Sequence, residues 1–131
     1  MAVQSAVQLP ATVTPVTTAE TVVLTLPFAG QGTARGPVLI QGFINYTQGT
    51  AGTAVTIRVR TGTTTGGTLI GAADVHTLAA AALAQIPFAA LDLAQFPAGN
   101  QYCVTVQATA ATGNPSVTDG VAFLDVISPA L

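Results

Sequence analysis

Short runs in which apolar and polar residues alternate dominate the chain. The clearest run covers residues 54–61, where Val55, Ile57 and Val59 alternate with a Thr and two Arg. Successive side chains of a strand point to opposite faces, so this alternation predicts a β-strand with one buried face. Further runs of this kind predict strands at residues 20–26, 37–47, 68–70, 85–93, 101–109 and 117–127.

Some positions leave the local structure open or interrupt a strand. Residues 74–85 fit either a strand up to Leu78 or a short helix through the following alanines, because Ala is a strong helix former. Gly42 marks a bulge or a close contact inside its strand, and Gly120 is expected to break the last strand. We therefore expect about eight short strands and almost no helix.

The spacing of these strands indicates the architecture. Short strands separated by turns rich in Gly, Pro and Asn are typical of a two-sheet sandwich or a barrel. No unit recurs at a fixed period, which argues against a solenoid or a propeller. We expect one all-β domain over residues 20–131.

The first 19 residues differ from the rest. They show no helical period, and Pro10 and Pro15 each favour an extended conformation in the residue before them. We predict an extended N-terminal arm over residues 1–19 that ties one subunit to the next; a frayed terminus or a plain edge strand is the alternative. The apolar residues that would contact a partner are Val3, Val7, Leu9 and Val13.

Charged residues are scarce. Only 6% of residues are charged, against about 25% in ordinary domains, and three Arg oppose five carboxylates for a net charge of −2. A nucleic-acid partner is not expected, because its phosphates require a cationic surface. Neutral surfaces avoid the free-energy cost of desolvating charges, which favours a subunit that packs against neighbours over a monomer with a Thr-rich surface.

No membrane segment or secretory leader is expected. The longest uninterrupted apolar run, residues 78–84, is far shorter than the roughly 20 residues that cross a bilayer. The first residues lack the cationic and apolar regions of a signal peptide.

Candidate catalytic and metal-binding groups are few. Asp74 and His76 share a face if their segment is a strand, so the carboxylate could orient the imidazole, but no nucleophile accompanies them. Asp119 and Asp125 lie six residues apart, a spacing that could serve Ca²⁺ or paired-carboxylate chemistry. Cys103 is expected to be a small buried or interface residue. We predict no enzyme, no catalytic residue, no metal and no cofactor.

Two of the three cations lie on one strand. Arg58 and Arg60 occupy the polar face of the strand at residues 54–61. They could form a solvated face that blunts edge pairing, or a docking point for a partner's carboxylate, since the guanidinium group binds carboxylates in bidentate geometry. We include both as candidate partner-binding residues.

Two stretches carry a resemblance to a known kind of domain. In the first, an apolar strand ends at Asp92, a turn follows at residues 97–100, and Tyr102, Val104 and Val106 open the next strand. The second is the final segment, residues 117–127. Both resemble small jelly-roll domains of phage virions, which are similar to the tumour-necrosis-factor-like trimeric sandwich.

The resemblance covers roughly residues 20–127 and implies a jelly-roll-like β-sandwich with a structural function. It implies a phage head decoration (cement) protein, a homotrimer on the outer surface of the virion that binds the major capsid protein across subunit joints. The alternatives are a fibre head that binds carbohydrate or a receptor, and a single-jelly-roll capsid shell protein. Sugar sites usually have exposed aromatic rings beside carboxylates or amides, and most Phe residues lie at core-like positions here.

Overall fold

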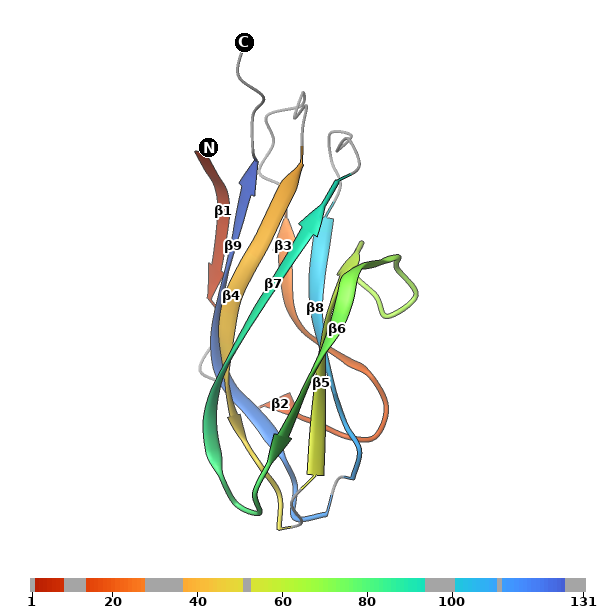
Figure 1. Cartoon of the computed structure of the whole chain (residues 1–131), viewed down its shortest axis with the longest axis vertical. Helices are drawn as coiled ribbons and strands as arrows, with labels where there is room; N and C mark the ends of the chain where they lie inside the picture. The colour runs from red at the N-terminus through yellow and green to blue at the C-terminus, as the bar shows by residue number, and fades with distance from the viewer. Residues whose placement is uncertain are drawn as a thin grey trace.

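The computed structural model of the chain is a sandwich of two antiparallel β-sheets (Figure 1). It describes residues 2–8, 14–27, 37–50, 53–93, 101–110 and 112–126. The strands in these ranges are β1 (Ala2–Gln8), β2 (Thr14–Pro15), β3 (Thr21–Pro27), β4 (Val38–Thr47), β5 (Thr53–Thr61), β6 (Leu69–Leu78), β7 (Leu83–Asp92), β8 (Gln101–Ala108) and β9 (Ser116–Val126). The predicted all-β, jelly-roll-like sandwich is confirmed.

Strands distant in sequence lie side by side in both sheets. One sheet has the order β1-β9-β4-β7, with the short β2 also paired to β9, and the other has the order β3-β8-β5-β6. Figure 1 shows β6 and β7 joined by a turn at one end of the sandwich, so this connection links the two sheets. Because β6 and β7 are edge strands of their own sheets, one open side of the sandwich lies between them.

The core forms between the sheets from the alternating residues of the central strands. Val55, Ile57 and Val59 are at most 3% exposed, as the alternation in β5 predicts. The other fully or nearly fully buried side chains of the central strands β4 and β8 are Val38, Ile40, Ile44, Tyr46, Tyr102, Cys103, Val104, Thr105, Val106 and Ala108. In β8 both faces are therefore covered, including the face that points away from the core.

The N-terminal residues join the sandwich. β1 pairs with β9 of the same chain, with Val3 opposite Asp125 and Val7 opposite Ala122. Val16 belongs to the core, at 2% exposure, and its amide donates a hydrogen bond to the carbonyl of Pro115. Residues 2–8 are thus an edge strand here. Leu9 and Val13 lie outside the described residues, and contact of residues 1–19 with a neighbour stays a prediction.

The glycine that we expected to break the last strand does not do so. β9 continues through Gly120, which pairs with Ile44 of β4. The irregularity in the pairing lies one step earlier, where Asn45 and Tyr46 pair with Asp119 and Val117. A Cβ at position 120 would lie 2.9 Å from the carbonyl oxygen of Phe43, so glycine serves close strand approach.

The alanine-rich segment is a turn. β6 extends to Leu78 and β7 starts at Leu83, so the strand alternative is confirmed and the short helix is wrong. Ala81 adopts a φ of 56° and its amide donates to the carbonyl of Gly49, 2.8 Å away. The need to connect two edge strands across the sandwich overrides the helix propensity of alanine.

Gly42 provides a test of the packing between β4 and β9. A Cβ at this position would collide with the carbonyl oxygen of Val121 and with the Cα of Ala122. We expect Gly42→Ala to lower the free energy of unfolding by about 1–3 kcal/mol, because the backbones must move apart. Urea denaturation measures this change.

The matched control is Gly66→Ala. Its Cβ would meet only the hydroxyl of Thr64 at 3.6 Å, so we expect a change within about 0.5 kcal/mol. Equal effects of the two substitutions would contradict the close approach of β4 and β9.

Candidate functional site

Arg58 and Arg60 lie on the outer face of the β3-β8-β5-β6 sheet. β5 is an interior strand between β8 and β6, so these side chains do not protect a sheet edge as one of our hypotheses had it. Arg58 stands opposite Thr105 and Arg60 opposite Cys103 of β8. Glu20 immediately precedes β3, which pairs with the other side of β8. The sheet order therefore brings the carboxylate over β8 toward both guanidinium groups.

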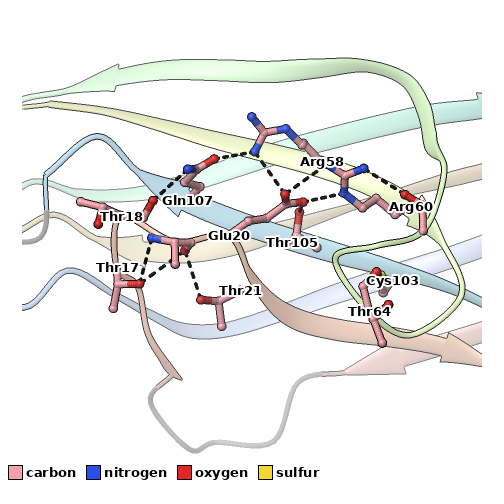
Figure 2. Close-up of polar contacts among 12 residues, drawn as sticks. Thr17, Thr18, Glu20, Thr21, Arg58, Arg60, Thr64, Cys103, Thr105 and Gln107 are labelled. Atoms are coloured by element: carbon pink, nitrogen blue, oxygen red, sulfur yellow. Dashed lines mark hydrogen bonds and ion pairs between the residues drawn. The ribbon is translucent and has the colours of Figure 1, made fainter.

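Glu20 bonds to both strands beneath it (Figure 2). Arg60 donates from Nε to Oε1 at 2.6 Å and from Nη2 to Oε2 at 3.1 Å, a bidentate pair. Nη1 of Arg58 lies 3.9 Å from Oε2, and the hydroxyl of Thr105 donates to Oε1 at 2.5 Å. The three charged side chains are only 16–22% exposed.

Further hydrogen bonds extend this cluster to two covering segments. Arg58 donates to Oε1 of Gln107 at 2.8 Å, and Gln107 donates to the carbonyl of Thr18 at 2.8 Å. Arg60 donates to the carbonyl of Gly67 at 3.0 Å, in the loop between β5 and β6. We call Glu20, Arg58, Arg60, Thr105 and Gln107 the arginine cluster. It fastens the loop and the start of β3 to the sheet.

The cluster shifts the titration of its members. The hydrogen bonds from Arg60 hold the pKa of Glu20 below its ordinary value, against the opposing effect of burial. The same carboxylate raises the pKa of Arg60. Glu20 is therefore ionised at neutral pH, and the cluster carries one net positive charge.

Sequence reasoning placed the two arginines on one polar face but missed their partner. Only the general rule that buried charges are paired pointed to a carboxylate, and Glu20 lies 40 residues from Arg60. The structure gives both arginines an intramolecular role. Their contact with a partner stays a prediction.

Cys103 lies beneath the same loop. Its side chain is buried, as expected, and its Sγ lies 3.7 Å from the carbonyl oxygen of Thr64. Burial raises the pKa of the thiol. A thiol in this state is a poor nucleophile, so Cys103 contributes packing.

An open groove of about 590 Å³ crosses β7 on the other sheet. Its lining comes from four strands and consists of Gln41, Gly42, Phe43, Asp74, His76, Pro87, Phe88, Ala89 and Phe123. We call this site the β7 groove. The sequence suggested that most Phe residues lie at core-like positions. Phe88 is buried, whereas Phe123 is 38% exposed and Phe43 is half-buried.

Asp74 and His76 meet in this groove. Both side chains are half-buried and project from the same face of β6, as the strand alternative predicts. No hydrogen bond joins them, and Nε2 of His76 is shielded from solvent without a partner among the described residues. The expectation that Asp74 orients the imidazole is therefore not fulfilled by a direct bond.

The remaining described carboxylates bind within the chain. Asp119 accepts a hydrogen bond from Nδ2 of Asn45 at 2.5 Å. Asp92 accepts one from the hydroxyl of Tyr102 at 2.6 Å, and burial together with this bond raises the pKa of Tyr102. The side chain of Asp125 lies outside the described part.

The described residues provide neither a metal-binding group nor a membrane-spanning helix. They contain no group of three or more His, Cys, Asp or Glu side chains placed to hold a metal ion. They also contain no helix with the length and apolar character that a membrane span requires.

The sequence was compared with two sets of known proteins. A comparison with protein-family models gave no match, and a comparison with curated proteins gave none either.

Solved structures share the fold. A chain of the infectious bursal disease virus Gx strain is 10% identical over 95% of this chain, with a TM-score of 0.59. A chain of the T13 particle of the same virus is 10% identical over 91%, with a TM-score of 0.60. This chain spans 34% and 30% of the length of those two proteins. At this identity the likeness shows a shared sandwich fold.

A weaker likeness connects the chain to a carbohydrate-binding module. The module CBM35 from Cellvibrio japonicus Abf62 is 16% identical over 96% of this chain and 100% of its own, with a TM-score of 0.43. A TM-score at this level does not establish a shared fold.

The arginine cluster predicts a pH-dependent contribution to stability. The lowered pKa of Glu20 means that the unfolded chain binds the proton more tightly than the folded one. The contribution is therefore complete above the ordinary pKa of 4.5 and is lost as the pH falls through the folded value. We expect Glu20→Gln to destabilise the protein by about 1.5–3 kcal/mol at pH 7.

This difference should shrink as the pH falls below 4.5, because the wild-type carboxyl group then also becomes neutral. Urea denaturation of both proteins between neutral pH and about pH 3 measures it. A difference that stays constant over this range would contradict the ion pairs at Glu20.

Proposed function

We propose that this chain is a virion structural protein, a phage head decoration protein that stabilises an assembled capsid. It sits on the outer surface of the shell as a homotrimer and binds the major capsid protein across subunit joints. Binding to the assembled state alone stabilises that state by mass action, and symmetric copies add avidity.

The placement of the charges carries this proposal. Glu20 pairs with Arg58 and Arg60 inside the chain, while Asp92 and Asp119 accept hydrogen bonds from neighbouring side chains. Asp74 is the only described charged side chain that has no hydrogen bond or ion pair with described residues. A partner can therefore cover most of the described surface without the cost of desolvating an unpaired charge.

Exposed apolar side chains support a contact at one side of the sandwich. Six large apolar side chains are exposed among the described residues. Five of them belong to β6 or β7 or directly follow β7: Leu69, Val75, Leu83, Leu91 and Leu93. Leu69 and Val75 project from the outer face of the β3-β8-β5-β6 sheet, and Leu83 and Leu91 from the outer face of the other sheet. They therefore flank the open side between β6 and β7, and exposed apolar side chains of this kind occur at protein contacts. We call these five residues the apolar edge and propose it as the contact with neighbouring subunits.

A partner at this edge would contact side chains and would not pair as an added strand with β7. β7 is an edge strand, and Pro87 in its middle has no amide hydrogen to donate to an added strand. The shared sandwich fold of the viral chains agrees with a role in a shell but does not by itself carry one.

The N-terminal residues and the two arginines complete the proposed contacts. Val3, Val7, Leu9, Val13, Arg58 and Arg60 are the candidates. Removing residues 1–19 would also remove β1 and the core residue Val16, so truncation would confuse folding with binding. Substitutions at exposed positions give a cleaner test.

We expect the double variant Val75→Asp with Leu83→Asp to lose shell binding. These side chains are 63% and 80% exposed, so the fold should tolerate the change, while each new carboxylate must be desolvated on contact. The measurement is co-sedimentation with shells assembled from the major capsid protein of the same genome. The apparent affinity should fall at least about tenfold, whereas wild-type binding should persist as NaCl is raised to about 0.5 M.

The control is Thr63→Asp with Thr65→Asp, which adds the same charge on the exposed loop between β5 and β6. It should bind as the wild type does. Wild-type binding by the double variant, or release of the wild type by salt, would contradict the proposed apolar contact.

A further inference from the structure

The β7 groove gathers the polar groups that the fold leaves without partners. Asp74 makes no hydrogen bond or ion pair with described residues, and Nε2 of His76 is buried without a partner among them. Both project into the groove, and Gln41 adds an exposed amide. Asp74 and the amide of Gln41 are open to hydrogen bonds from a ligand, and a ligand that reaches Nε2 of His76 would satisfy a buried polar atom whose lack of a partner costs free energy.

Aromatic rings form the other part of the lining. On the outer face of the β1-β9-β4-β7 sheet, Phe123 stands opposite Gln41, and Gln41 stands opposite Ala89. Phe43 is two residues further along β4 and stands opposite Pro87. The lining therefore spans three adjacent strands, a width of about 10 Å at the usual strand spacing. It offers an apolar platform with polar groups along one side.

This combination fits one class of ligand. A sugar ring has apolar C–H faces that pack on phenyl rings, and hydroxyl groups that both donate and accept hydrogen bonds. Asp74 can accept from them, His76 can donate or accept, and Gln41 can do both. An anionic ligand would be repelled by Asp74, because no cationic Arg lines the groove. The volume of about 590 Å³ lies within the range of small-ligand sites.

We propose that the β7 groove binds a neutral saccharide, with Phe43 and Phe123 as the stacking surface and Asp74, His76 and Gln41 as hydrogen-bonding partners. None of the five residues of the apolar edge lines the groove. Leu83 and Leu91 do share the outer face of β7 with Pro87 and Ala89, on either side of the groove. The two proposals are therefore tested with different variants and different partners, so that either can fail without the other.

The test is a titration of the ¹⁵N-labelled full chain with neutral oligosaccharides, followed by two-dimensional NMR. The probes are maltohexaose, cellohexaose, xylohexaose and chitohexaose. At least one should shift the amide signals of groove residues, with a dissociation constant on the order of 1 mM, typical of a shallow site. Choline chloride serves as a competing probe, because a carboxylate beside aromatic rings can also hold an organic cation.

Two substitutions and one control test which side chains contact the saccharide. Phe123→Ala should weaken binding about tenfold by removing the stacking ring. Asp74→Asn should weaken it about fivefold, because the amide keeps the shape but loses the charge-assisted hydrogen bond. The control Thr77→Ala changes an exposed side chain beside His76 on the opposite face of β6, and should leave affinity unchanged. Thermal denaturation checks that each variant is folded.

Three results would overturn the proposal. The first is the absence of groove shifts at about 20 mM of every saccharide. The second is a response of the groove to choline alone. The third is saccharide binding that Phe123→Ala and Asp74→Asn leave unchanged. None of these results affects co-sedimentation with shells, which tests the proposed function separately.

Discussion

One carboxylate organises the outer face of the β3-β8-β5-β6 sheet. Glu20 binds Arg60 in bidentate geometry, lies near Arg58 and accepts a hydrogen bond from Thr105. These contacts join the start of β3 to both central strands, and Arg60 continues to the loop above Cys103. Two of the three arginines in the chain thus belong to one cluster of contacts within the molecule.

This use of charge has a consequence for the surface. A soluble domain ordinarily keeps its charges in water, where they oppose association. Here most of the described charged groups form ion pairs or hydrogen bonds within the chain, and apolar side chains are exposed along β6 and β7. Such a surface favours contact with neighbours over permanent exposure to water. The unpaired polar groups that remain lie together in the β7 groove, where they can serve a ligand.

Local pattern was sufficient for most of the fold. The alternation of Val55, Ile57 and Val59 predicted β5 and its buried face, because strand side chains alternate whatever their partners are. The alternation did not predict the local structure at positions where tertiary contacts determine it. β9 continues through Gly120, where the absence of a side chain allows the backbone of β4 to approach closely. The alanines before Leu83 form a turn because the two sheets must be connected there.

The sites depended on pairings that the sequence does not display. Asp74 and His76 could be placed on one face from their spacing. Their neighbours Phe43 and Phe123 required the register of β4 with β9, and Glu20 required the position of β3 beside β8. Residues far apart in sequence come together only through strand order, which alternation does not encode.

We propose that other subunits cover this surface, whose described charges are mostly paired. The most direct measurement is the molar mass of the purified chain in solution, by light scattering after size exclusion over a range of concentrations. We expect a stable trimer of about 39 kDa, three times the chain mass of 13.0 kDa. A monomer at every concentration would contradict the proposed homotrimer and would leave the apolar edge to be covered by the shell alone.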